Sequence, residues 1–300
     1  MGERDGMLVL AVAGHSREWA AVADPHSGVT RKRRLPGGTL CHGPLLAVGG
    51  QVVFSGYRGR LGVARVLPLT LRGPARSLGE ADTFAPSPAA DHLWLGRWRG
   101  RRQGARLGLH QVDLEGRVSV SARILGARWG SLHAALRRGF VLTIRGSLVV
   151  WDNFLDAPSL TVRGGWFVAA SETRVAWCGE NCRRFRVWSR QGERTLSPPT
   201  GVRPLGSVGT FSPDGRQLAT GATVRGRTRM AVVDLRSGVW TLVPGGRLGG
   251  YNAIAWSPSG NWLYFTDSDE RVRAWRLGAP STVAVPIRPG GTVISIATAP

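Results

Sequence analysis

Apolar residues recur along this chain in short runs, and glycine, proline, serine or aspartate separates one run from the next. Runs of this kind, bounded by turn residues, predict β-strands joined by tight turns. The clearest example is Phe211–Thr220, in which a Ser-Pro-Asp-Gly turn stands between a bulky apolar residue and a second apolar run. The same pattern returns 45 residues later at Trp256–Phe265. A repeat near this length is typical of an array of four-stranded units.

A second pattern, an apolar run that ends in a polar turn, marks the third strand of each unit. Its seven copies are Val22–Gly28, Val63–Pro68, Val112–Gly116, Val149–Asn153, Val187–Gly192, Val232–Gly238 and Arg273–Gly278. The chain opens on what should be a second strand, Leu8–Ala13, and a spare strand, Thr292–Ala297, follows the last unit. We therefore expect the C-terminal strand to complete the first unit, because that pairing removes exposed strand edges.

These patterns together predict an all-β fold, a seven-bladed β-propeller of four-stranded antiparallel blades whose first blade is closed by the C-terminal strand. We expect a single domain over residues 1–300. The approximate blades are 8–40 plus 291–298, 44–80, 83–126, 131–163, 166–200, 207–246 and 252–288. The tryptophans interpreted as packing between blades are Trp94, Trp151, Trp177, Trp188, Trp256 and Trp275.

The Phe-Ser-Pro-Asp-Gly phrase at 211–215 and the Trp151-Asp152 pair resemble the WD40-like repeats of the bacterial TolB-type propeller group. The motif is specific in the last two units, and period and register extend the resemblance to the rest of the chain. The resemblance implies a propeller that acts as a binding platform, and it carries no catalytic residues over to this chain. Asp234–Trp240 is also similar to the blade signature of quinoprotein dehydrogenases, but only one unit shows it.

The net charge of the chain indicates what kind of partner it could bind. The chain has 40 lysines and arginines against 19 aspartates and glutamates, a formal net charge of +21, and Lys32 is its one lysine. Such an excess favours contact with a phosphate polymer, an anionic lipid surface or an acidic protein, and does not choose among them. The preference for arginine over lysine fits a GC-rich genome equally well.

The predicted register sorts these charges. In a propeller, the loops between second and third strands and the loops that join blades lie on one face, and most arginines fall in those loops. We predict a basic ligand-binding face, built from Arg58, Arg60, Arg97, Arg99, Arg101, Arg102, Arg128, Arg225, Arg227 and Arg247. The alternative is that these loops simply carry solubilising charge.

Other candidate chemistry is sparse. Cys178 and Cys182 flank a three-residue hairpin loop, so we expect them at bridging distance, either as a disulfide or as two reduced thiols. The carboxylates of Asp267–Glu270 could hold calcium, but a short solvated turn is the favoured interpretation. We predict no metal, because the histidines lack ligand spacing, and no cofactor.

The sequence therefore predicts a non-enzymatic, monomeric propeller scaffold that binds a protein or an anionic polymer or surface, without sequence-specific recognition of nucleic acid. The alternative is an enzyme that uses the central channel, either a quinone-dependent oxidoreductase or a metal-assisted hydrolase. Met7–Gly14 is interpreted as a strand rather than a secretion signal, and no transmembrane segment is predicted. A bridged cysteine pair would indicate an extracytoplasmic or envelope location, and reduced thiols a cytoplasmic one.

Overall fold

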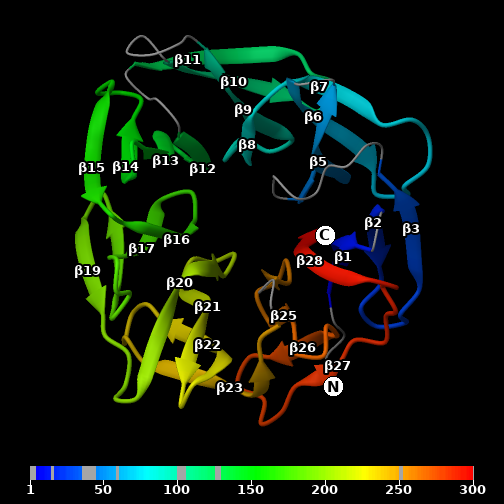
Figure 1. Ribbon diagram of the computed structural model, residues 1–300, viewed down its shortest axis with the longest axis vertical. Helices are drawn as coiled ribbons and strands as arrows, with labels where there is room; N and C mark the ends of the chain where they lie inside the picture. The colour runs from blue at the N-terminus through cyan, green and yellow to red at the C-terminus, as the bar shows by residue number, and fades with distance from the viewer. Residues whose placement is uncertain are drawn as a thin grey trace. The chain divides into compact units, whose positions relative to one another are not determined.

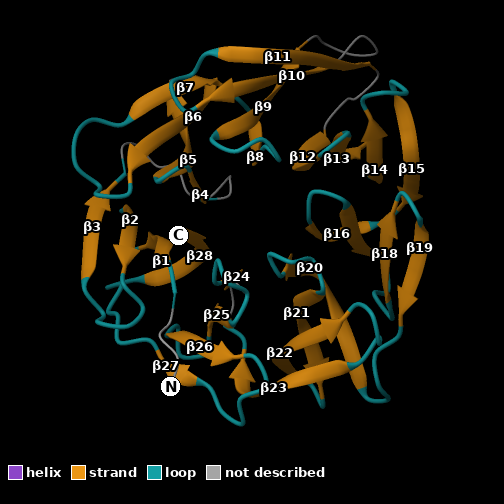
Figure 2. Cartoon of the chain, turned by 180° about the vertical axis from the view of Figure 1, so that it is seen from behind, coloured by secondary structure: helices purple, strands orange, loops and turns teal. Residues whose placement is uncertain are grey.

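The computed structural model describes residues 5–14, 17–35, 45–58, 61–99, 106–125, 130–249 and 253–299. These residues form strands and loops without a helix, so none of them belongs to a helix long and apolar enough to cross a membrane. The strands make seven four-stranded antiparallel sheets (Figures 1 and 2). The predicted all-β class and the number of blades are confirmed. Each sheet is called a blade below, numbered I to VII along the chain.

The chain divides into two compact units, of which the first combines residues 1–35 with residues 166–300. It contains blades I, V, VI and VII. Their strands are β28 (Thr292–Ala299), β1 (Met7–Ala13), β2 (Glu18–Ala23) and β3 (Thr30–Arg34); β16 (Trp166–Ala170), β17 (Arg174–Cys178), β18 (Phe185–Ser189) and β19 (Gly192–Leu196); β20 (Val202–Phe211), β21 (Gln217–Val224), β22 (Arg227–Asp234) and β23 (Trp240–Arg247); β24 (Ile254–Trp256), β25 (Trp262–Thr266), β26 (Val272–Arg276) and β27 (Val283–Ala284).

The second unit spans residues 36–165 and contains blades II, III and IV. Their strands are β4 (Leu46–Val48), β5 (Gln51–Arg58), β6 (Leu61–Pro68) and β7 (Arg76–Glu80); β8 (Thr83–Pro86), β9 (His92–Arg99), β10 (Arg106–Asp113) and β11 (Val118–Leu125); β12 (Gly130–Leu136), β13 (Gly139–Ile144), β14 (Ser147–Asp152) and β15 (Ala157–Arg163).

The C-terminal strand β28 completes blade I, as predicted. It pairs antiparallel with β1 from Met7 opposite Ala299 to Ala13 opposite Thr292, and Figure 1 shows β28 beside β1. Its Val293 and Ile296 side chains are buried in an apolar cluster that also contains residues of β1 and of blade VII. The last strand is therefore part of the core of the first blade.

The Ser-Pro-x-Gly phrase forms the turn between the first and second strands of blades VI and VII. The hydroxyl of Ser212 accepts a hydrogen bond from the amide of Gln217 (2.9 Å), and Ser257 is bonded to the amide of Trp262 in the same way (3.2 Å). Gly215 has a φ of 66°, a left-handed conformation that favours glycine. The two copies are therefore one turn used twice.

An aspartate caps the turn after the third strand in several blades. The carboxylate of Asp234 accepts hydrogen bonds from the amides of Arg236 (3.0 Å) and Ser237 (2.6 Å). Asp24 and Asp113 accept two backbone amides in the same manner. In all three, these backbone bonds hold the carboxyl pKa below its usual value. This geometry is an Asx turn, which ends the strand and starts the outer one.

Apolar side chains fill the space between consecutive blades of each unit. In the first unit, Phe185 of blade V stacks on Trp240 of blade VI with ring centroids 5.6 Å apart. In the second unit, Trp94 of blade III meets Phe140 of blade IV edge to face at 4.7 Å. Trp177, Trp256 and Trp275 are buried as well. The tryptophans are thus mainly packing residues.

Deleting residues 292–300 should destabilise the protein by on the order of 4 kcal/mol or more, because blade I loses two buried aliphatic side chains and an entire strand. Urea unfolding followed by tryptophan fluorescence measures this effect. The control Ser295→Ala, in the same strand, should shift the unfolding free energy by no more than about 0.5 kcal/mol. A truncated protein with the wild-type midpoint would contradict the structural role of β28.

His133 should make stability depend on pH. It lies at the bulge of β12, its Nε2 is 2.7 Å from the hydroxyl of Thr143, and burial lowers its pKa from 6.5 to about 4. Between about pH 6.5 and pH 4, His133 is protonated in the unfolded chain but neutral in the folded protein. The free energy of unfolding should therefore fall as the pH drops from about 6.5 through about 4. In His133→Gln the decrease in unfolding free energy caused by this histidine should disappear. The exposed control His26→Gln should keep the pH dependence of the wild type. Urea unfolding at pH 7 and pH 4.5 tests the difference.

Candidate functional site

Five of the ten predicted basic-face arginines can be placed with their side chains. Arg60, Arg101, Arg102 and Arg128 lie outside the described residues, and Arg58 is described only through its backbone at the end of β5. The five that can be placed are Arg97 and Arg99 in blade III and Arg225, Arg227 and Arg247 in blade VI.

The two arginines of blade III lie within a strand rather than in a loop. β9 continues to Arg99, because Trp98 packs against the core between blades III and IV and so prolongs the apolar alternation of the strand. Arg97 forms an ion pair with Glu80 of β7. Its charge is thus compensated within the protein. The loop placement was wrong for Arg97 and Arg99, and also for Arg58 at the end of β5, Arg227 at the start of β22 and Arg247 at the end of β23.

Blade VI concentrates arginines at one end, which we call the basic end. Its members are Arg203, Arg225, Arg227, Arg229 and Arg247. β20 begins there, the turn between β21 and β22 lies there, and β23 ends there. Arg225 occupies that turn with a φ of 49°, beside Gly226. The side chains of Arg225, Arg227 and Arg247 are exposed.

A local break in β23 brings two of these arginines together. The ladder between β22 and β23 is interrupted at Val243–Gly246, and it resumes with Arg247 directly opposite Arg229. Gly245 has a φ of 68°, and Leu248 is buried and donates its amide to Thr228 (3.2 Å). The bulge and the anchored leucine thus fix Arg247 in place.

Among the described residues, the arginines of the basic end are not paired with carboxylates. Within the described ranges, none of its five guanidinium groups takes part in an ion pair, and the Nε of Arg229 is buried without a hydrogen-bond partner. Like charges directly opposite each other in a ladder are destabilising. An anion bound between Arg229 and Arg247 would relieve this repulsion.

A pocket of about 390 Å³ opens next to the basic end, between blades V and VI. Its lining includes Trp166, which is 55% exposed, together with Arg203, Thr223 and one carboxylate, that of Glu180. Arg203 donates a hydrogen bond to the carbonyl of Asn181 at 3.3 Å. The pocket therefore offers an aromatic surface and a held guanidinium to a ligand that also reaches the basic end.

Cys178 and Cys182 are paired as a disulfide, with their Cα atoms 5.0 Å apart. The predicted three-residue hairpin was too short, because β18 begins only at Phe185 and Cys182 lies in the loop itself. The amide of Cys182 donates to the carbonyl of Gly179 (2.8 Å), which closes a tight turn. Gly206 of blade VI packs on the two sulfurs, and a Cβ there would lie 2.9 Å from one of them.

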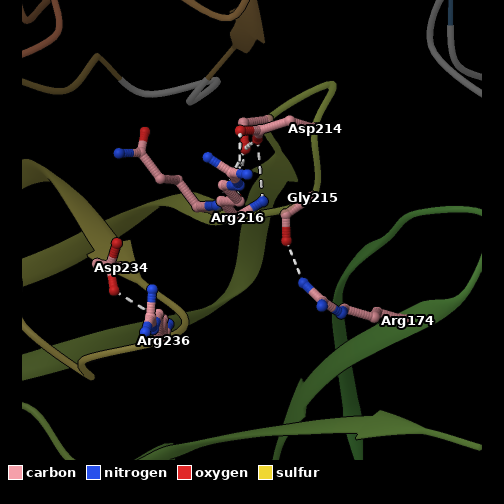
Figure 3. Close-up of polar contacts among 8 residues, drawn as sticks. Arg174, Asp214, Gly215, Arg216, Asp234 and Arg236 are labelled. Atoms are coloured by element: carbon pink, nitrogen blue, oxygen red, sulfur yellow. Dashed lines mark hydrogen bonds and ion pairs between the residues drawn. The ribbon is translucent and has the colours of Figure 1, made fainter.

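A second cationic region lies at the opposite end of the same two blades, and sequence analysis missed it. It is a groove of about 790 Å³, which we call the V–VI groove. Four arginines line it, Arg174, Arg194, Arg216 and Arg236, together with two carboxylates, Asp234 and Glu193, of which Glu193 is paired with Arg186. Figure 3 shows Arg174 of blade V pointing to Gly215 of blade VI. The available signal was the position of Arg216 and Arg236, each two residues after a turn aspartate.

The acidic loop at Asp267–Glu270 is a hairpin turn in which Ser268, Asp269 and Glu270 are exposed, as expected, but Asp267 is not. Asp267 is buried, and its carboxylate accepts the amides of Asp269 and Arg271 (both 2.9 Å) and the Nε of Arg273 (2.7 Å). Glu270 accepts the hydroxyl of Thr292 at 2.8 Å. These internal donors occupy the oxygens that a cation would need. Among the described residues, no group of three or more His, Cys, Asp or Glu is arranged to hold a metal.

No protein-family model and no curated protein matches this sequence. Solved structures do match. TolB from Acinetobacter baumannii is similar with a TM-score of 0.61 and 14% identity, over 100% of this chain and 68% of that chain. The chain is a β-propeller. The predicted resemblance to TolB-type propellers is thus confirmed at the level of the fold.

Enzymes also occur among the structures that share this propeller fold. The periplasmic gluconolactonase PpgL of Pseudomonas aeruginosa matches with a TM-score of 0.60 and 15% identity, over 98% of this chain and 99% of that chain. An acylaminoacyl peptidase matches with a TM-score of 0.67 and 9% identity, over 94% of this chain and 52% of that chain. At these identities, the likeness describes the propeller and not the activity.

Removing the disulfide should destabilise the propeller moderately. Because the bridge closes a loop of only five residues, Cys178→Ser/Cys182→Ser should lower the free energy of unfolding by about 2 kcal/mol. The experiment is urea unfolding in a Cys41→Ser background, with and without reductant. Reductant should lower the parent to the level of the double variant and leave the double variant unchanged. Equal stability of all four samples would contradict the bridge.

Proposed function

We propose that this propeller is a non-enzymatic, monomeric binding scaffold, and that the basic end of blade VI takes an anionic ligand: an acidic protein, or an anionic polymer or surface. The observation that carries the proposal is the pair of arginines, Arg229 and Arg247, which lie opposite each other without a carboxylate partner in the part of the chain that the structure describes. A fold that tolerates this repulsion gains free energy when a ligand supplies the missing negative charge.

The surroundings of the pair favour a ligand larger than a single small ion. Arg225 and Arg227 are exposed beside the pair, and the pocket with Trp166 and Arg203 extends the surface toward blade V. Guanidinium groups bind carboxylate, sulfate and phosphate through paired hydrogen bonds, and an exposed indole adds a stacking surface. A chain of anionic groups could therefore contact several arginines at once.

The paired cysteines support an oxidising compartment, because disulfides persist mainly outside the cytosol. We accordingly propose that the scaffold works at the cell envelope. A basic, exposed end would there meet the anionic polymers and lipids of the surface.

The triple variant Arg225→Ser/Arg227→Ser/Arg247→Ser should bind heparin about tenfold more weakly than the wild type, because charge-assisted contacts are lost. Salt-gradient elution from immobilised heparin and sedimentation with vesicles of anionic lipid measure the change. The control Arg72→Ser/Arg138→Ser/Arg276→Ser removes the same charge from exposed positions in three other blades. If both triple variants elute together, net charge alone determines binding and the proposed site is wrong.

A further inference from the structure

The V–VI groove contains two kinds of arginine. Arg174 donates a hydrogen bond to the carbonyl of Gly215, and Arg194 donates to the carbonyls of Leu235 and Arg236. Both side chains thereby cross from blade V to the turns of blade VI and hold the walls of the groove together. Their charge still contributes to the groove, although their hydrogen bonds are partly used.

The guanidinium groups of the other two arginines, Arg216 and Arg236, make no close hydrogen bond to another described residue. Arg216 has an 83% exposed side chain, and its Nε lies 3.7 Å from Asp214, too far for a strong hydrogen bond. The carboxylate of Asp214 instead accepts the hydroxyl of Ser212 at 2.6 Å and the amide of Arg216 at 3.0 Å. Figure 3 shows Asp214 and Arg216 at the β20–β21 turn.

Arg236 resembles Arg216 in its surroundings. Asp234 beside it is engaged by backbone amides and by the hydroxyl of Ser237 (2.7 Å), and it bonds the amide of Arg236 rather than its side chain. The side chain of Arg236 is exposed and lines the groove. These hydrogen bonds lower the carboxyl pKa of both aspartates. The largest contribution comes from the Ser212 hydroxyl for Asp214 and from the Ser237 amide for Asp234. Most hydrogen bonds that the two aspartates accept therefore come from donors in their own turns.

The groove also has an apolar part. Val187 and Leu196 of blade V and Leu235 of blade VI line it, and all three belong to the cluster between these blades. Gln191, at the β18–β19 turn, adds an amide that can both donate and accept. A phosphate polymer has no group that benefits from apolar contact, whereas a peptide can place an aliphatic side chain there.

We propose that the V–VI groove binds a short peptide segment in which acidic residues alternate with aliphatic ones, the carboxylates meeting Arg216 and Arg236 and an aliphatic side chain covering the Leu196 region. The volume of about 790 Å³ accommodates several residues. The site lies at the opposite end of blades V and VI from the basic end, so it goes beyond the function proposed above.

The test uses the full chain and a fluorescein-labelled peptide, Gly-Glu-Leu-Glu-Leu-Glu-Gly, in fluorescence polarisation. Two matched peptides replace leucine by serine or glutamate by glutamine. The parent peptide should bind at least about tenfold more tightly than either, because both charge and apolar contact are needed. Arg216→Ser/Arg236→Ser should abolish that preference, and both substitutions affect exposed side chains that the fold does not require.

The control Arg72→Ser/Arg138→Ser removes the same charge from exposed positions in two other blades and should leave peptide affinity within about twofold of wild type. Equal peptide binding by the wild type and by Arg216→Ser/Arg236→Ser would overturn the proposal. Equal binding of the serine peptide, or displacement of the parent peptide by equimolar polyphosphate, would also overturn it, in favour of a general anion groove. Arg216→Ser/Arg236→Ser leaves the arginines of the basic end unchanged, so a failure of the peptide test does not alter the result expected with heparin.

Discussion

A four-stranded blade of this protein cannot bury both of its faces by itself, and the whole structure follows from that constraint. Phe185 and Leu218, Met230 and Trp275, and Tyr264 and Leu10 are buried in apolar clusters shared by consecutive blades. Each blade therefore depends on its neighbour for its core. A missing strand at either end of the chain would expose an apolar face, which explains why β28 returns to β1 instead of ending as a tail.

Polar contacts reinforce the same interfaces. Arg76 of blade II donates to the carbonyl of Leu114 in blade III (3.2 Å), and Arg194 of blade V donates to the equivalent carbonyl, that of Leu235, in blade VI. Each carbonyl directly follows the aspartate of the turn after the third strand. The aspartate orders the turn, and the ordered turn presents its carbonyl to the previous blade. Part of the arginine excess thus serves the fold, and only the rest is available to ligands.

Local patterns predicted the parts of the structure that depend on local chemistry. The Ser-Pro-x-Gly turn and the polar turns after the third strands could be found, because Gly215 and Asp234 act within a few positions of the turns they determine. The closing strand pairs with β1 at the other end of the chain, and it could be found because the strand count left one strand missing at the start and one spare at the end. The placement of Arg97 failed because strand length depends on whether Trp98 finds a core to pack against. That core belongs to two blades, and spacing along one strand does not reveal it.

The candidate sites depend on nonlocal geometry for the same reason. The Pro-Gly-Gly break in β23 is visible as a turn signal, but the return of the chain to the same ladder, with Arg247 opposite Arg229, is a property of the folded blade. Likewise, Arg174 and Arg194 reach carbonyls 41 residues further along the chain, and only the stagger between neighbouring blades brings them there.

The two cationic ends of blade VI differ in why their exposed arginines make no close hydrogen bond to a carboxylate among the described residues. At the basic end, Leu248 and the bulge force two like charges together, and buried apolar area offsets the repulsion. In the V–VI groove, aspartates stand beside Arg216 and Arg236, but the backbone has already engaged their oxygens. The guanidinium groups there keep free hydrogen-bond donors, because a carboxylate that orders a turn is a poor hydrogen-bond partner for a flexible side chain. Repeated Asx turns can therefore leave neighbouring arginines free for a ligand without any change in net charge.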